Sequence, residues 1–225
     1  MRDLGIRVLI EGVNLQRLLL GLAVTARIAF IAVAFSMVLG VPFGILMTRR
    51  NAALRFLCRF YLEAMRIIPV LVWLFIFYFG LARNFHINLS AAAAAVLVFT
   101  LWGTAEMGDI VRGAVTSLHR HQYESAHALG LSEVQLYLYV IIPQAARRLV
   151  PGAINLTTRM IKTTSLVVLI GIVEMLKVGQ QIIESNFLKS PTAAFWVYGL
   201  IFFLYFILCM PVSRLSKRLE RRWQS

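Results

Sequence analysis

The chain alternates long uncharged apolar stretches with short segments rich in arginine. A membrane-spanning helix needs about 20 mostly apolar residues. Four stretches approach or exceed that length without an internal charge: Ile28–Met47, Ile67–Ala82, Asn84–Ala105 and Ser190–Ser213. Arginines at the ends of the second stretch can lengthen it, because their stems lie in lipid while their heads reach water. The pattern therefore predicts four membrane-spanning helices.

A fifth stretch, Leu149–Ile183, is apolar but contains Arg159, Lys162, Glu174 and Lys177. We still expect a helix there, because otherwise the apolar sequence between residues 114 and 189 would lie in water. Charges inside such a span usually face protein or a wet cavity. The prediction is an all-α, polytopic membrane helical bundle, a single domain over residues 1–225, with five transmembrane helices near 17–47, 59–83, 88–113, 151–180 and 192–213.

Composition agrees with a membrane protein. Of the 225 residues, 60% are hydrophobic and only 15% charged, with a mean hydropathy of +0.77, whereas soluble domains carry about 25% charged residues. The net charge of +13 would suggest a nucleic-acid partner on a soluble chain. On this chain it fits basic loops beside membrane lipid, so we expect no nucleic acid. Cys58 and Cys209 form neither a disulfide framework nor a metal-ligand spacing.

The basic residues predict the orientation, because cytoplasmic loops carry an excess of Lys and Arg. Thirteen lie in the segments after the first, third and fifth spans, against five on the opposite side. This predicts that the N-terminus lies outside the membrane, and that the 114–150 loop and the C-terminus lie in the cytoplasm. The five on the outer side are Arg2, Arg7, Arg17, Arg83 and Lys189.

The segment Gln122–Pro151 holds the most specific pattern. A short helix over Gln122–Leu129 is expected to stop at Gly130, which can adopt positive φ. Ser132 can cap a second helix, with Gln135 at the capping-box position. Pro143 is then expected to end or kink that helix. A helical knuckle with small residues at its tip suits docking into a groove of a partner protein.

Glu124, Ser125 and Ala126, followed by Gly130 and Pro143 at matching spacing, resemble the cytoplasmic EAA loop of ABC importer permeases. The resemblance continues through Tyr61, Glu63, Arg66, Pro69 and Phe75 and through Lys162 to Leu166, so that residues 15–222 resemble one subunit of a polar amino-acid importer. It implies the type I ABC importer permease fold. Ile67, Glu106 and Thr163 depart from the usual pattern, and Thr163 stands where the family often has Asp.

A nucleotide-binding P-loop is absent from the sequence. That motif ends in Gly-Lys-Ser or Gly-Lys-Thr, and no Gly-Lys dipeptide occurs in the chain. We therefore expect a non-catalytic subunit that binds no cofactor or metal itself, with ATP and Mg²⁺ held by a partner. Together with the resemblance, this implies a cytoplasmic ABC ATPase dimer, a second permease and an extracytoplasmic substrate-binding protein. The sequence leaves open whether the second permease is a distinct paralogue or another copy of this chain.

Ionisable and polar residues inside the spans are candidates for substrate contact. Glu63 and Arg66 are spaced to pair on one helix face, and Glu106, Asp109 and Arg112 form a second stripe. A zwitterionic amino acid needs partners of both signs. The candidate ligand-binding set is Glu63, Arg66, Glu106, Asp109, Lys162 and Thr163.

Other interpretations stay open at this point. The charged stripes can be structural pairs that hold helices together, Glu174 and Lys177 most of all, and the threonines can bond to their own backbone. The runner-up function is a stand-alone secondary transporter or channel. The absence of an internal repeat argues against it, because such transporters commonly contain repeats.

Overall fold

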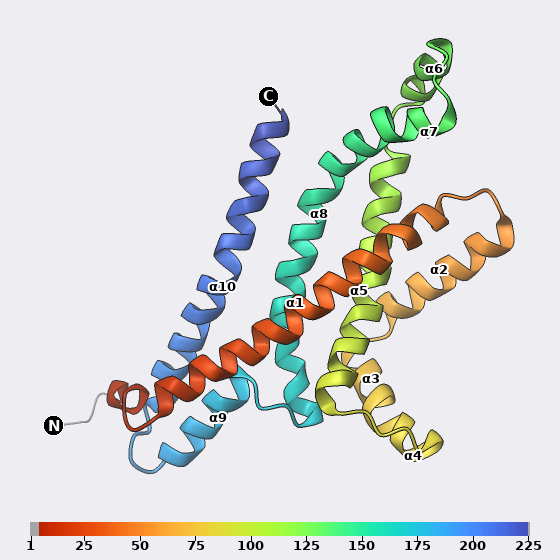
Figure 1. Cartoon of the computed structure of the whole chain (residues 1–225). Coiled ribbons are helices and arrows are strands. Elements are labelled where there is room, and N and C mark those ends of the chain that lie inside the picture. The colour runs from red at the N-terminus through yellow and green to blue at the C-terminus, as the bar shows by residue number, and fades with distance from the viewer. Residues whose placement is uncertain (1–4, 225) are drawn as a thin grey trace. The chain divides into compact units, whose positions relative to one another are not determined.

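The computed structural model describes residues 5–224, and every regular element within them is helical (Figure 1). Short 3₁₀ segments cover Ile6–Leu9 and Thr164–Ile170, and π-helical turns cover Ile76–Gly80 and Tyr137–Ile141. The α-helices are α1 (Asn14–Met47), α2 (Ala52–Ile67), α3 (Val70–Phe75), α4 (Leu81–Phe85), α5 (Ala91–Thr116), α6 (Arg120–Ala128), α7 (Glu133–Leu136), α8 (Ile142–Thr163), α9 (Met175–Asn186) and α10 (Ala193–Gln224).

The all-helical membrane architecture is confirmed, but two of the five expected spans are not single helices. By length and composition, α1, α5 and Ala193–Arg221 of α10 can each cross a membrane. The other two candidates are bent pairs: α2 with Val70–Phe85 at 99°, and Glu133–Ile170 with α9 at 55°. The described chain therefore has three continuous candidate spans, or up to five when each bent pair is one span.

Local backbone chemistry explains both bends. Ile68 has extended dihedrals, φ −80° and ψ 125°, as a residue before proline prefers, and Pro69 then starts a new direction. In the second pair the 3₁₀ segment ends at Gly171, whose φ of 88° is strained for any other residue. The hydropathy pattern gave one span near 59–83 and one near 151–180 because it records apolar length and not backbone direction.

Of the two outcomes expected at Pro143, an end or a kink of the helix, the structure contradicts the end, and the kink stays a prediction. Helical backbone runs from α7 through the π turn Tyr137–Ile141 into α8. In the π turn, the Ile142 N–H donates to the Tyr137 carbonyl five residues back. This widened register ends just before Pro143, which removes the clash that its ring would make with a carbonyl four residues earlier.

Two compact units make up the chain, each assembled from three separate stretches. Unit 1 comprises Met1–Ile31, Leu71–Val98 and Arg159–Pro211; unit 2 comprises Ala32–Val70, Phe99–Thr158 and Val212–Ser225. The single permease domain over residues 1–225 stays a prediction.

Unit 1 centres on apolar contacts among the N-terminal half of α1, α9 and α10. Its buried cluster includes Leu18, Met175, Ile182 and Val197. Glu174 is fully buried, and its carboxylate accepts from the Lys177 backbone N–H at 2.9 Å and from the Thr25 hydroxyl at 3.1 Å. Glu174 is therefore the N-cap of α9 and links it to α1. The expected Glu174–Lys177 pair forms through the Lys177 backbone and not through its ammonium group.

Unit 2 packs the C-terminal half of α1 closely against α5. A Cβ atom added at Gly44 would lie 2.5 Å from the Gly108 carbonyl oxygen, closer than real Cβ atoms approach backbone. The Ser36 hydroxyl also donates to the Thr100 carbonyl at 3.3 Å. On the other side of α5, the Tyr61 hydroxyl of α2 donates to the Leu101 carbonyl at 2.7 Å. These contacts fix α1 and α2 against α5.

Replacing Gly44 by alanine should destabilise unit 2, because the added methyl group meets backbone that cannot move aside. Overpacking costs about 1–3 kcal/mol, which corresponds to a fall in Tm of roughly 2–12 °C for a chain of this size. The measurement is thermal unfolding of the permease purified in detergent. Gly113→Ala, on α5 with nothing within 4 Å of the new Cβ, is the matched control and should keep or slightly raise Tm. Equal Tm values for the two variants would contradict the close α1–α5 packing.

Candidate functional site

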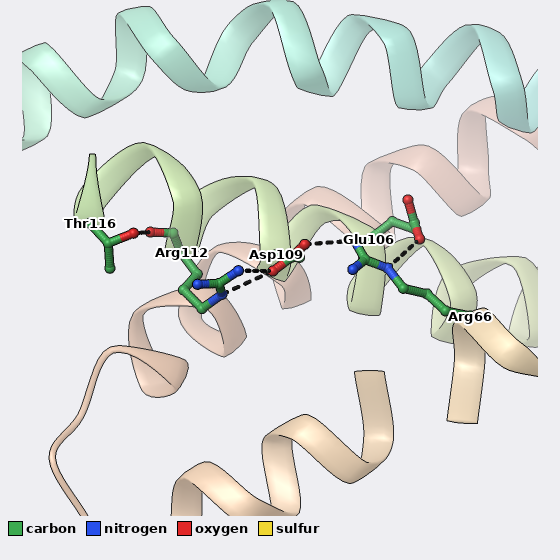
Figure 2. Close-up of polar contacts among 5 residues, drawn as sticks. All are labelled: Arg66, Glu106, Asp109, Arg112 and Thr116. Atoms are coloured by element: carbon green, nitrogen blue, oxygen red, sulfur yellow. Dashed lines mark hydrogen bonds and ion pairs between the residues drawn. The ribbon is translucent and has the colours of Figure 1, made fainter. Parts of the chain in front are cut away.

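Arg66 joins α2 to α5 through two carboxylates (Figure 2). Its Nε donates to Glu106 Oε1 at 3.0 Å and its Nη2 donates to Asp109 Oδ2 at 2.6 Å. The other oxygen of Asp109 accepts from Nε and Nη2 of Arg112, at 2.9 and 2.6 Å. Two guanidinium groups and two carboxylates thus form one network, and both carboxylate side chains are largely buried, 11% and 18% exposed.

The network follows from residue spacing on two helices. Glu106, Asp109 and Arg112 lie three residues apart and therefore on one face of α5. Arg66 lies in the last turn of α2, just before the bend at Pro69. The expected pair of Arg66 with Glu63 is wrong: among the described residues Arg66 bonds to α5 instead. The two carboxylates of α5 offer the Arg66 guanidinium two charge-assisted hydrogen bonds. Glu63, which lies on α2 with Arg66, would offer only one carboxylate.

A cavity of about 470 Å³ lies beside this network, between the end of α1, α2 and α5. Glu63, Arg66 and Asp109 line it, so the structure brings three predicted ligand residues to one cavity and Glu106 to its edge through Arg66. Four further lining arginines were not predicted as site residues. They are Arg49, Arg55, Arg59 and Arg112. The spacing of Arg55, Arg59 and Glu63, four residues apart on α2, is the sequence signal that could have found this lining.

Lys162 and Thr163 belong to unit 1, so the structure does not place them with the other four candidates. Lys162 is exposed on α8. The hydroxyl of Thr163 donates to the Arg159 carbonyl at 2.9 Å, and those of Thr164 and Ser165 donate to Ile161 and Lys162 carbonyls. These hydroxyl groups donate to backbone carbonyls of their own helical segment, which is the structural alternative to ligand binding that the sequence left open. The Thr163 oxygen keeps its capacity to accept a hydrogen bond.

The loop between α6 and α7 forms two turns that the sequence predicted. Gly130 has a φ of 74°, and the N–H groups of Gly130 and Leu131 donate to the carbonyls of His127 and Ala126, at 2.9 and 3.1 Å. This is a Schellman C-cap. Ser132 and Gln135 then form the predicted capping box at the start of α7, with reciprocal bonds of 3.4 and 2.9 Å.

The loop also has an apolar core of its own. Ala126 is only 3% exposed and packs with side chains from the end of α5, α7, the π turn and α8: Ala114, Leu118, Leu136, Ile141 and Ala145. Glu124, Ser125 and Gly130 are exposed. We expected Ala126 at the docking tip with these three, but it faces inward, so its small size serves packing within the loop.

Polar contacts complete the loop. Glu124 pairs with Arg120 at 3.0 Å, and His127 lies 3.5 Å from Glu133. The Gln144 amide, next to Pro143 in α8, donates to Gln122 of α6 at 2.8 Å. Burial, together with the neighbouring Tyr137, raises the pKa of Tyr123 above its ordinary value. The phenol therefore stays neutral at physiological pH.

Within residues 5–224, no group of three His, Cys, Asp or Glu side chains could hold a metal ion.

Comparison with known proteins places these features in a family. Residues 40–225 match the model of the binding-protein-dependent transport system inner membrane component. The glutamine transport system permease protein GlnP of Escherichia coli strain K12 is 32% identical over 203 residues, 90% of either chain. The probable glutamine ABC transporter permease protein GlnP of Bacillus subtilis strain 168 is 31% identical over 202 residues, 90% of this chain and 91% of the relative.

Solved structures agree with this family in fold. A crystal structure of an amino acid ABC transporter with histidines matches with a TM-score of 0.83 at 26% identity, covering 92% of this chain and 94% of that one. An inward-facing form of the MetNI methionine ABC transporter matches with a TM-score of 0.71 at 20% identity, over 91% and 97% of the two chains. The latter likeness concerns the fold alone.

The family sets aside the alternative of a stand-alone secondary transporter or channel, because its members work within binding-protein-dependent systems. Its permease subunits are non-catalytic, as the missing P-loop predicted. An ABC system also includes an ATPase that supplies the energy. The family match over residues 40–225, the helical architecture and the 90% coverage of the relatives agree. The chain belongs to the binding-protein-dependent transport system inner membrane components, and it is a multi-pass permease subunit of an ABC importer in the inner membrane.

Proposed function

We propose that this subunit forms part of the translocation path for a polar amino acid, with glutamine as the first substrate to test. The Escherichia coli and Bacillus subtilis relatives, which are named as glutamine permeases, support the substrate class. The cavity beside Arg66 supports it independently, because its volume of about 470 Å³ falls in the range of small-ligand sites. The mixture of acidic and basic side chains in one cavity between α2 and α5 is the observation on which the proposal rests.

The chemistry of a zwitterion suits this lining. Its carboxylate needs a guanidinium or ammonium group, and its ammonium needs an acid. Arg66 and Arg112 offer the first, and Glu63 offers the second without giving up an ion pair, since it has none among the described residues. Glu106 and Asp109 orient Arg66. Lys162 and Thr163, which belong to unit 1, stay separate candidates for substrate contact. A neutral polar side chain fits better than a basic one, because Thr163 replaces an acid that the family often has.

Single substitutions at these positions should weaken or abolish substrate-stimulated ATP hydrolysis in the reconstituted importer. Glu63→Gln should lower it about 10- to 100-fold, since one ionic hydrogen bond contributes about 1.5–3 kcal/mol. Asp109→Asn and Arg66→Gln should act in the same direction. The matched control is Glu220→Gln, because Glu220 bonds to Ser216 on α10 away from the cavity. Wild-type stimulation by glutamine and related amino acids in all of the cavity variants and in Lys162→Ala and Thr163→Ala would remove this site.

The assembly is proposed to contain two permeases and two ATPases, because one bundle cannot enclose a central path. We further propose that the second permease is similar but distinct, with one subunit binding substrate while the other mainly gates. Thr163 in place of an acid supports such a division of roles. Affinity purification of this chain from its host membrane should recover the ATPase and a second permease in equal amounts. Transport by liposomes that contain only this permease, its ATPase and its binding protein would contradict the unlike pair.

Coupling to the ATPase is proposed to occur through the α6–α7 loop. Glu124, Ser125 and Gly130 would seat in a groove of the ATPase, which holds ATP and Mg²⁺, and Ala126 and Pro143 would support the tip from within the loop. The exposed position of the first three and the packed core beneath them support this role. A basic residue of the groove would then pair with the Glu124 carboxylate in place of Arg120.

Gly130→Asp and Glu124→Lys should stop transport while leaving the permease in the membrane. A side chain at positive φ costs roughly 1–2 kcal/mol and adds bulk at the tip, whereas Glu124→Lys inverts the contact charge. The ATPase should dissociate in mild detergent or hydrolyse ATP without response to substrate. Gly12→Asp is the matched control, because Gly12 also has positive φ, 57°, in open space but lies outside the loop. Normal uptake with a substrate-responsive ATPase in both loop variants would rule out the coupling role.

A further inference from the structure

The charges that line the α1–α2–α5 cavity are unevenly distributed. At one end, Arg66 and Arg112 are balanced by Glu106 and Asp109. The remaining lining charges are Arg49, Arg55, Arg59 and Glu63. None of these four forms an ion pair with the side chains that the structure describes. Arg55 and Arg66 are 11 residues apart on α2, about 16 Å along its axis. The end near Arg55 therefore carries uncompensated positive charge.

The surface of α2 divides into three faces. One face is buried within unit 2 and consists of Cys58, Leu62 and Met65. At 100° per residue, the next face holds Arg55, Arg59, Glu63 and Arg66, the side chains that line the cavity. The third face, directly beside the arginines, is apolar and exposed: Phe56, Leu57, Phe60 and Ile67, with Phe56 and Phe60 69% and 67% exposed. A row of cations next to exposed aromatic side chains is typical of a helix that lies at the membrane interface.

We propose that this end of the cavity binds the phosphate of an anionic phospholipid. Arg49, Arg55 and Arg59 would hold the headgroup, because the guanidinium fork matches phosphate oxygens. Phe56 and Phe60 would contact the acyl chains. On the orientation predicted from the basic residues, this end faces the cytoplasmic leaflet, where anionic headgroups bind basic pockets between membrane helices.

A lipid fits the surface better than a soluble anion does. Inorganic phosphate would use the arginines but would leave the adjoining apolar face in contact with solvent. An anionic lipid satisfies both faces of α2 at once, since its charge and its chains are covalently joined. The lipid site also lies at the other end of the cavity from Arg66 and Asp109. It therefore does not depend on the proposed amino-acid path, and lipid retention can be measured without transport.

Native mass spectrometry of the purified importer complex tests the proposal. Phosphatidylglycerol should bind and survive delipidation, whereas phosphatidylcholine should not. Arg55→Gln with Arg59→Gln should weaken phosphatidylglycerol binding roughly 25-fold, taking about 5-fold for each arginine near an anionic lipid. The matched control is Arg214→Gln with Lys217→Gln on α10, two exposed cations on the same predicted side of the membrane. The control should keep wild-type binding, and millimolar inorganic phosphate should not displace the lipid.

Several outcomes would overturn the lipid site. Equal losses in the two double variants would show diffuse surface attraction, and displacement by inorganic phosphate would show a soluble-anion site. Failure of the wild-type complex to retain phosphatidylglycerol would mean that protein covers the α2 face. If Arg55→Gln with Arg59→Gln prevents assembly, Arg55→Lys with Arg59→Lys keeps the charge. That variant should bind the lipid more weakly than wild type but more tightly than it binds phosphatidylcholine, and equal affinity for the two lipids would count against the proposal.

Discussion

The contact of Arg66 with α5 is the interaction on which unit 2 depends most. Arg66 lies 40 residues before Glu106 and 43 residues before Asp109 in the sequence. In addition, α2 does not continue as a straight helix after Ile67. A largely buried carboxylate in a membrane protein must be paired, because an isolated charge there costs several kcal/mol. Arg66 pairs Glu106 and Asp109 together, and Arg112 adds the second cation. The bend at Pro69 and the network therefore support each other: the bend ends α2 beside α5, and the ion pairs keep it there.

Both breaks in the predicted spans occur where the backbone is satisfied locally. After the 3₁₀ segment, the Glu174 side chain accepts the Lys177 N–H that the start of α9 would leave without a partner. At the other break, the Ile68 N–H donates to Ala64 at 3.2 Å before the chain turns. The bends place polar side chains at helix ends instead of in the middle of apolar spans.

Sequence reasoning predicted the helical class, the positive-φ helix stop at Gly130 and the capping box at Ser132, because these depend on residues close together in sequence. It also grouped Glu106, Asp109 and Arg112, which share one helix face. It missed the partner of Arg66, because that contact needs the packing of two helices and local spacing offered Glu63 instead. It misjudged Ala126 for the same reason: a small residue suits a tip and a packed interior equally well. It did not predict that the helix continues through Pro143, because the π turn that precedes this residue is announced by no short pattern.

On the proposed function, the α6–α7 loop has to move as a block, since a tip that yields would absorb the motion of the ATPase. Its packing meets that need. Ala126 and Leu136 close a core that includes Ala114 in the last turn of α5 and Leu118 two residues beyond that helix. Arg148 of α8 donates to the Ser117 carbonyl and hydroxyl at 2.6 and 2.7 Å. From Thr116 to Asp109 is seven residues, about 10 Å of one continuous helix. A displacement of the tip therefore reaches the Arg66 network through the rigid body of α5. Because Arg66 belongs to α2, that displacement has to strain or break its two bonds unless α2 moves as well, and this makes the network the place where loop motion and cavity shape are linked.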